Sequence, residues 1–415
     1  MKNTLIDKEE TKNRKLGYFF ILSLIGFFAI FSSTMSKSPI LPIFAESLIS
    51  SEFEMQFIGY VIAASTIPGI IISVFAGRLS DAYGRKKIIL ISTGIFASAP
   101  FFYLFAINIW ILIIIRFYHG FSTAIFVPVT IAAIAESYPE KKGKYISSFS
   151  SITLVGRFLA PLTGGLILFI TNYYYYGVYL GCAFSGTIAL LLMLFLYGTR
   201  QYQTNQTKHV ESELKSSISI KNFLQGIKDV LSNKIILTTC IIQASQYFAY
   251  GVIEAYIILY AKYLHFVVWI LGIIPAILTL MLVVFKPLMG SLSDKVGRRI
   301  IITIGLLLGG CVSFVIPFTS DYFWFILILC GFGIGMAMVT SSTAAYVSDL
   351  TERKDYGAAI GVLSTIMDIG QTIGPIISGY VLIAFSFGGV FSMVGFVLLA
   401  SALIFSLIRN FSSSG

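Results

Sequence analysis

The sequence predicts an all-α membrane protein of twelve transmembrane helices, arranged as two pseudo-symmetric six-helix halves around a central cavity. The composition, the long apolar stretches and an internal repeat lead to this prediction. Of the 415 residues, 57% are hydrophobic and 12% are charged, and the mean hydropathy is +0.87. Soluble domains carry about 25% charged residues, so a chain this apolar needs lipid around it. The composition excludes a cytosolic enzyme, a nucleic-acid-binding protein and a disordered chain.

Twelve stretches are apolar and long enough to cross a bilayer, which takes about 20 residues in a helix. The predicted spans are 17–36, 55–77, 88–107, 109–135, 146–170, 177–197, 236–259, 267–289, 300–319, 322–346, 358–385 and 388–408. A polar tail precedes the first stretch, and no cleavage signature follows it. We therefore expect a retained span rather than a signal peptide.

The basic residues predict the orientation of these spans. All but five of the 29 Lys and Arg residues fall in the two terminal tails and in alternate loops. Cytoplasmic loops are rich in Lys and Arg, so we expect both termini in the cytoplasm. Trp110, Trp269 and Trp324 begin spans on the other side, where indole rings favour the membrane interface. The net charge of +10 is thus a topology signal and does not indicate a nucleic-acid partner.

The chain is expected to divide into an N-terminal half (1–198), a cytoplasmic linker (199–235) and a C-terminal half (236–415). Apolar linker residues are spaced along one helical face, which predicts an interfacial amphipathic helix on the inner leaflet. The linker is too short to bury an enzyme core. Nucleotide-binding, metal-ligand and nucleophile motifs are missing from the sequence. We therefore expect no enzymatic activity, no cofactor and no metal.

Two motifs recur at half the length of the chain. Residues 77–87 (GRLSDAYGRKK) are repeated at 290–299 (GSLSDKVGRR), an offset of 213 residues. Residues 156–165 (GRFLAPLTGG) are repeated at 370–379 (GQTIGPIISG), an offset of 214 residues. Each copy occupies the same place within six predicted spans. The repeat therefore predicts two related six-helix halves.

These motifs resemble those of the major facilitator superfamily, over the whole chain. The repeated loop resembles its signature GxLaDrxGrkx, and Arg116 to Gly120 resembles its RxxxG pattern in span four. The span-five segment resembles the GxxxGPxxGG pattern of proton-driven exporters, with Ala160 in place of the central glycine. The resemblance implies a secondary transporter whose two halves rock about a central cavity.

The loop motif predicts a gate at the cytoplasmic side. Gly77 allows helices to approach closely, Gly84 allows a tight turn, and Asp81 can accept hydrogen bonds from the start of a neighbouring helix. The alternative is that these charges only fix the topology. The residues expected to gate are Gly77, Asp81, Gly84, Arg85, Glu136, Gly290, Asp294, Gly297, Arg298 and Asp349.

The resemblance also implies partners for this gate in the opposite half. Asp81 would bind the start of span eleven near Gly357, and Asp294 the start of span five near Gly143. Such contacts would lock the cytoplasmic side and break when the halves rock. The expected ion pairs, related by the repeat, are Arg85 with Glu136 and Arg298 with Asp349.

Polar stripes on three predicted spans indicate a water-filled cavity. A charge at the membrane centre is unfavourable by at least about 2.5–3.5 kcal/mol, so each one suggests a function. Span four carries Arg116, His119, Thr123 and Thr130; span seven carries Gln243, Gln246, Tyr247, Tyr250 and Glu254; span eleven carries Ser364, Asp368, Gln371 and Thr372. Residues expected to line the substrate cavity are Arg157, His119, Gln243, Gln246, Tyr247, Tyr250 and Gln371.

The cavity is expected to be basic on its N-terminal wall (Arg116, Arg157 and Lys37) and acidic on its C-terminal wall (Glu254 and Asp368). A buried carboxyl can bind and release a proton in the working pH range, so Asp368 and Glu254 are the expected proton-coupling acids. Arg116 is their expected positive partner.

Several of these assignments have an alternative. Arg157 and Asp368 are either functional or a permanent structural ion pair, and His119 is either a proton relay or a packed histidine. Lys286 can snorkel to the cytoplasmic edge and is given no role. The glycine-rich faces of spans five and eleven point away from the stripes, towards helix packing: Gly156, Pro161, Gly164, Gly165, Gly370, Gly374, Pro375 and Gly379.

The sequence therefore predicts a proton-coupled antiporter that exports small, amphipathic, drug-like compounds by alternating access. The rivals are an uptake symporter or facilitator for sugars or organic acids and, from another class, a transport-like membrane receptor. The expected partners are the lipid bilayer, protons and a small-molecule substrate, without nucleic acid. We expect a monomer in the plasma membrane, with multiple spans.

Overall fold

The computed structural model describes residues 2–198, 228, 232–351 and 356–407. The predicted interfacial helix of the linker falls almost wholly on 199–227 and 229–231, outside these residues. The N-terminal half consists of α1 (Lys2–Lys37), α2 (Ile40–Ser47), α3 (Phe57–Ala63), α4 (Ile67–Tyr83), α5 (Arg85–Phe102), α6 (Ile109–Ser137), α7 (Lys142–Ile170) and α8 (Tyr175–Gly198). The C-terminal half consists of α11 (Lys234–Tyr263), α12 (Val268–Val296), α13 (Arg298–Val315), α14 (Tyr322–Leu350) and α15 (Tyr356–Leu407).

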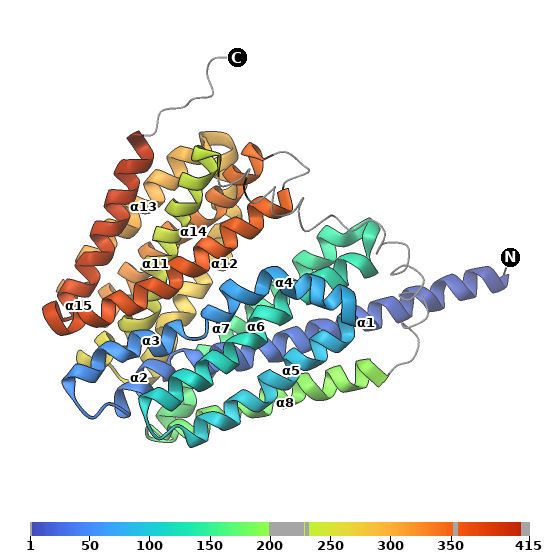
Figure 1. Ribbon diagram of the computed structural model, residues 1–415, viewed down its shortest axis with the longest axis horizontal. Helices are drawn as coiled ribbons and strands as arrows, with labels where there is room; N and C mark the ends of the chain where they lie inside the picture. Colours follow the sequence, from blue (N-terminus) through green and yellow to red (C-terminus); the bar gives the residue numbers. More distant parts are fainter. Residues whose placement is uncertain (1, 199–227, 229–231, 352–355, 408–415) are drawn as a thin grey trace, which may run out of the picture.

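Eleven segments of the described chain are apolar and long enough to span a membrane. The last of them, Ala358–Leu407, has 50 residues and contains two spans. At Ser386 the backbone leaves the helical region (φ 56°, ψ −170°), and α15 folds back on itself there (Figure 1). The two parts agree with the predicted spans 358–385 and 388–408. The all-α fold of twelve spans in two halves is therefore confirmed.

The second predicted span, 55–77, differs from expectation because it is not one helix. Residues 64–66 form a turn between α3 and α4. Pro68 follows the turn at the start of α4, where its missing N–H breaks no helical hydrogen bond. The break allows the outer and inner parts of this span to lean at different angles.

The two halves meet along two seams, which we name after their helices. In the α7–α12 seam, α7 packs on α12; in the α4–α15 seam, α3 and α4 pack on the first part of α15. Helices α4 and α12 carry the two copies of the loop motif, and α7 and α15 carry the two copies of the glycine motif. The two seams are therefore related by the sequence repeat: α7 corresponds to α15, and α12 corresponds to α4.

Glycines bring the backbones of the two halves into contact at both seams. A Cβ on Gly165 would lie 2.8 Å from the Cα of Gly272, and a Cβ on Gly379 would lie 2.4 Å from the carbonyl oxygen of Gln56. Contacts this short leave no room for a side chain. Other glycines of the repeated motif pack within one half: Gly156 on Phe27, Gly164 beside Met35, Gly370 on Ala244 and Gly374 on Phe248.

The seams are closed at one end of the molecule only. We call the end where α5, α7 and α13 begin the basic end, because Arg85, Lys142 and Arg298 lie there. At the opposite end a single hydrophobic core continues from one half into the other. Towards the basic end each half has its own core. The two bundles accordingly diverge towards the basic end, as Figure 1 shows.

Candidate functional site

An ion pair joins the two halves in the interior of the protein. Lys37, the last residue of α1, places its Nζ 2.6 Å from Oε2 of Glu254 on α11. The two side chains are 20% and 14% exposed. Gln371 Nε2 on α15 donates to the same carboxylate oxygen over 3.3 Å, and Tyr250 lies 3.5 Å from Oε1. The carboxylate of Glu254 is therefore bound from both halves at once.

Asp368 also faces the N-terminal half, without an ion pair. Its Oδ2 lies 3.2 Å from the position that a Cβ would take on Gly69 of α4. One turn further along α15, Thr372 bonds to Thr66 over 2.5 Å and so joins the halves. The carboxylate makes no hydrogen bond or ion pair with another residue in the described ranges.

Arg157 is exposed and likewise has no ion pair among the residues the structure describes. It lies on the same face of α7 as Pro161, one turn nearer the basic end. Pro161 packs on Gly272 of α12, so this face of α7 is turned towards the C-terminal half. The alternative ion pair between Arg157 and Asp368 is not formed in this structure.

Arg116 and His119 lie inside the N-terminal half. Arg116 is 3% exposed; its Nη1 donates to the Tyr103 hydroxyl over 3.0 Å and its Nη2 to Ser65 Oγ over 2.7 Å. His119 Nδ1 lies 3.2 Å from the same tyrosine oxygen. The structure thus brings both residues together with Tyr103, and not with Glu254 or Asp368. Their position in span four alone did not show which side of the helix faces its own bundle.

The polar stripe on α11 is divided between two environments. Gln243 accepts a hydrogen bond from Thr343, and Gln246 is fully buried, so both belong to the interior of the C-terminal half. Tyr247 and Tyr250 pack edge to face, with ring centres 6.2 Å apart, and Glu254 continues the stripe towards Lys37. The part of the stripe that faces the other half is therefore Tyr247, Tyr250 and Glu254.

The expected ion pairs of the loop motif form in both copies. Arg85 Nε lies 3.1 Å from Glu136 Oε1, and Arg298 Nε lies 3.1 Å from Asp349 Oδ2. Gly84 and Gly297 have φ values of 93° and 107°, which only glycine adopts without strain. Both turns therefore have the same geometry.

The aspartates of the motif stay within their own halves. Asp81 pairs with Arg85 and Asp294 with Arg298, and each aspartate side chain is 58% exposed. Gly143, expected to lie near Asp294, has no neighbour within 4 Å of where its Cβ would be. The expected contact of Asp81 near Gly357 adjoins 352–355, which are outside the described residues. Gly77 lies in α4 and Gly290 in α12, and a Cβ on Gly290 would lie 3.9 Å from the Cβ of Ser341.

The polar contacts that close the other end were not predicted. Lys262 pairs with Glu46 over 2.7 Å, and the hydroxyls of Tyr60 and Tyr380 are 2.8 Å apart. Glu46 and Lys262 both lie in predicted loops on the side opposite the basic loops, so their shared location at this end was evident. Their pairing depends on how the halves dock, for which the sequence contains no local signal.

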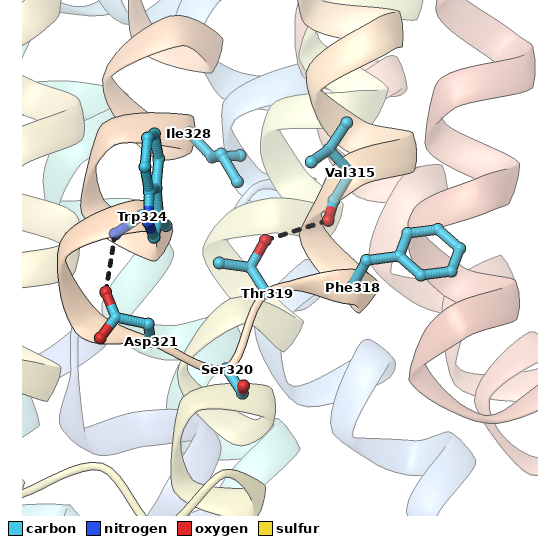
Figure 2. Close-up of a pocket in the computed structure, with 7 residues that line it drawn as sticks. All are labelled: Val315, Phe318, Thr319, Ser320, Asp321, Trp324 and Ile328. Carbon is cyan, nitrogen blue, oxygen red and sulfur yellow. Dashed lines mark hydrogen bonds between the residues drawn. The ribbon is translucent and has the colours of Figure 1, made fainter.

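A surface pocket of about 300 Å³ lies elsewhere, beside the connection from α13 to α14 (Figure 2). Two of its polar side chains bond to the backbone at the helix ends: Asp321 accepts from the backbone N–H groups of Phe323 and Trp324, and Thr319 donates to the Val315 carbonyl. We therefore place the candidate site between the halves, around Glu254 and Asp368, and not in this pocket.

The chain is similar in sequence and in fold to known membrane transporters. Residues 22–285 and 239–413 match the profile of the Major Facilitator Superfamily. Multidrug resistance protein 2 of Bacillus subtilis is 24% identical over 385 residues, which cover 92% of each chain. The multi-drug resistance efflux pump PmrA homolog of Lactococcus lactis is 24% identical over 389 residues, which cover 91% of each chain. The structure of a D-xylose-proton symporter covers 93% of this chain and 96% of its own, with 16% identity and a TM-score of 0.71, a likeness of fold alone.

Proposed function

The chain belongs to the Major Facilitator Superfamily, and we propose that it is a proton-coupled antiporter that exports small amphipathic organic compounds by alternating access. The superfamily consists of carriers, so the chain is a multi-pass membrane transporter and not an enzyme. The observation that carries the proposal is the Lys37–Glu254 ion pair between the halves, with the unpaired Asp368 nearby.

The basic end is assigned to the cytoplasm, because Lys and Arg are retained on that side of membranes. The arrangement is then closed towards the outside and open towards the inside. In the opposite state the seams would open at the outer end and the basic end would close. The protein would act in this way as a monomer in the cell membrane, with both termini inside.

The Lys37–Glu254 pair links the protonation of Glu254 to this movement. While the outer end is closed, the carboxylate of Glu254 is held by the ammonium of Lys37 across the two halves. When the halves separate at the outer end, Glu254 would lose Lys37, and in this proposal it is the carboxyl that takes up a proton from outside. Each cycle therefore carries a proton inwards. The electrical contribution is about 2.3 kcal/mol per charge at 100 mV.

Asp368 is the second acid in this mechanism. It lies closer to the basic end than Thr372, the last residue that bonds across the α4–α15 seam. In the inward-open state its carboxylate is thus available to a substrate or a proton from the cytoplasm. Competition between the two for one carboxylate is the simplest basis for exchange.

The loop motifs would close the basic end in the other state. Arg85 and Arg298 hold the two turns in place through Glu136 and Asp349. Asp81 and Asp294 remain more than half exposed, so each can reach a helix start of the opposite half when the basic ends approach.

Export of drug-like compounds is supported by the names of the relatives, which are a multidrug resistance protein and an efflux pump homolog. The glycine motif of α7, residues 156–165, resembles the pattern of proton-driven exporters, which favours antiport. The sugar–proton symporter shares the fold, which by itself carries no substrate specificity.

The test is proton movement in liposomes that contain the purified protein. Vesicles are loaded with acid, a panel of amphipathic compounds is added outside, and internal pH is followed with a trapped dye. Antiport predicts that a transported compound enters while protons leave. Proton entry with the compound would indicate symport, equilibration without proton movement a facilitator, and binding without flux a receptor.

A further inference from the structure

The surface pocket beside the connection from α13 to α14 lies at the level of the membrane surface. The spans Arg298–Phe318 and Tyr322–Leu350 are joined by residues 319–321, at the end opposite the basic end. The pocket of about 300 Å³ lies beside this connection (Figure 2). Trp324, whose indole ring favours the membrane interface, forms one of its walls. The pocket therefore lies at the depth of the lipid headgroups of the outer leaflet.

The walls of the pocket change from polar to apolar with depth in the membrane. The polar side chains of Thr319, Ser320 and Asp321 lie at the connection itself. Val315 is the last residue of α13 and Ile328 lies about two turns into α14, so both lie deeper in the membrane. This order of polar and apolar groups matches the headgroup and the acyl chain of a phospholipid.

Asp321 uses one of its carboxylate oxygens to cap α14. Oδ1 accepts from the N–H groups of Phe323 and Trp324, over 2.9 and 3.2 Å. Oδ2 has no bond to any residue that the structure describes, and none of the seven residues that line the pocket is basic. Lys262, a basic residue at the same end, is paired with Glu46. The second oxygen of Asp321 is therefore available to a cationic group of another molecule.

The internal repeat shows that the fold does not need this charge. Residues 106–108 (AIN) correspond to 319–321 (TSD), at the offset of 213 residues. In both copies the third of these residues caps the helix that follows, since Asn108 accepts from the N–H of Ile111 over 3.0 Å. An amide thus serves the cap as well as a carboxylate does. The charge of Asp321 is accordingly a property of the pocket and not of the helix cap.

We propose that this pocket binds the headgroup of a phospholipid that carries a primary ammonium, of the phosphatidylethanolamine type, from the outer leaflet. The ammonium donates to Asp321 Oδ2, the phosphate accepts from the Ser320 hydroxyl, and the first part of one acyl chain lies against Val315 and Ile328. The volume is at the lower limit of small-molecule sites, about 300–1,000 Å³, so it suits a headgroup and not a whole lipid.

The chemistry of the pocket distinguishes this headgroup from others. A choline headgroup has the same charges but no N–H to donate to Asp321. A headgroup without a cation would bring its phosphate against the carboxylate, which is unfavourable. The pocket lies apart from the space between the halves, so the inference does not depend on the proposed transport function.

Trp324 serves as a reporter inside the pocket, because the chain has only three tryptophans. Trp110→Phe with Trp269→Phe leaves Trp324 alone. Trp269→Phe with Trp324→Phe leaves Trp110 alone, at the start of α6 in the other copy of the repeat, as the matched control. Each full-length protein is placed in phosphatidylcholine vesicles that contain a small fraction of brominated phosphatidylethanolamine or brominated phosphatidylcholine. The bromine atoms lie near the headgroup end of one acyl chain and quench an indole only at short range.

Brominated phosphatidylcholine in phosphatidylcholine defines random occupation of the pocket. At equal mole fraction we expect brominated phosphatidylethanolamine to bind beside Trp324 at least about twofold more strongly, the effect of a partly hydrated ion pair. Trp110 should be quenched equally by the two lipids. Asp321→Asn, which keeps a side chain that caps α14 as Asn108 caps α6, should make the two lipids equal at Trp324.

Equal quenching of Trp324 by the two lipids in the protein that retains Asp321 would overturn the inference. This comparison needs no substitution of Asp321, so a folding defect of that variant cannot hide the answer. A preference that survives in Asp321→Asn, or that is equally strong at Trp110, would indicate ordinary lipid contact around the protein and would overturn it as well. None of these outcomes concerns proton movement, so a failure here leaves the proposed antiport unaffected.

Discussion

The ammonium of Lys37 and the carboxylate of Glu254 lie 2.6 Å apart and connect the end of α1 in one half to the middle of α11 in the other. Both side chains are largely buried, so water screens their attraction only weakly. The pair cannot persist when the outer ends of the halves separate. The pair thus depends on the conformation of the carrier, which is why we propose Glu254 as a proton-coupling acid.

Replacement of Glu254 by glutamine is expected to uncouple proton movement from transport. The amide is nearly the same size, but it cannot bind a proton or form an ion pair with Lys37. Proton-driven accumulation in liposomes should fall by at least about tenfold, while exchange of labelled for unlabelled substrate continues. The exchanged pair Lys37→Glu with Glu254→Lys restores the attraction, and should restore closure of the outer end. Normal accumulation by Glu254→Gln would show that this carboxyl is not a coupling acid.

Asp368→Asn removes the other acid while leaving the Thr66–Thr372 contact one turn away in place. We expect the same loss of proton-driven accumulation, also with surviving exchange, because substrate and proton no longer compete. The measurement is substrate uptake into inside-out vesicles with and without a pH gradient. Thr365→Ser on the same helix, which keeps the hydroxyl that bonds to the Gly361 carbonyl, is the control. A pH-dependent response equal to that of the control would argue against a role for Asp368.

Asp81→Asn is expected to shift the conformational equilibrium towards the state that is open at the basic end. The substitution removes the charge that would bind a helix start of the opposite half when this end closes. Distances between spin labels at Lys142 and Lys295, after the four native cysteines are replaced, report the two populations. Glu140→Gln, on the same side but outside the motif, is the comparison. An unchanged distance distribution would contradict the gating role.

Gly165→Leu is expected to disfavour the state seen here. A Cβ at this position would lie 2.8 Å from the Cα of Gly272, so a larger side chain forces α7 from α12 at the closed end. Overpacking of this kind is unfavourable by about 1–3 kcal/mol, enough to change the populations several-fold. The matched control is Gly94→Leu, since Gly94 has no atom within 4 Å of its Cβ position. A cysteine is introduced in place of Phe57, near the closed end. Its rate of labelling by a thiol reagent should rise in Gly165→Leu and stay unchanged in Gly94→Leu.

The number of spans was predictable because every helix that crosses the bilayer needs an apolar segment of similar length. About 20 consecutive apolar residues must cover the backbone in the membrane, and the described structure has helices at each predicted span. The break at 64–66 was not predicted, because the apolar run continues through it. On the α3 side of the break the backbone lies against α15, since a Cβ on Gly59 would lie 2.1 Å from the Pro375 carbonyl oxygen.

The candidate site was predicted less completely than the fold. Glu254 and Asp368 could be found because charges inside apolar spans are rare. Which partner each one meets depends on the rotation of its helix and on the docking of the two halves. For this reason Lys37 emerged as the partner of Glu254, and Arg116 was found inside its own bundle.

Local composition and the repeat were thus sufficient for the membrane fold, the two halves and the turns at Gly84 and Gly297, because these follow from hydrophobicity and backbone sterics within short segments. The ion pair across the halves, the closure of one end and the unpaired charges at both seams depended on contacts between segments as much as 300 residues apart. Such contacts are set by how whole bundles pack, which no single segment of the chain encodes.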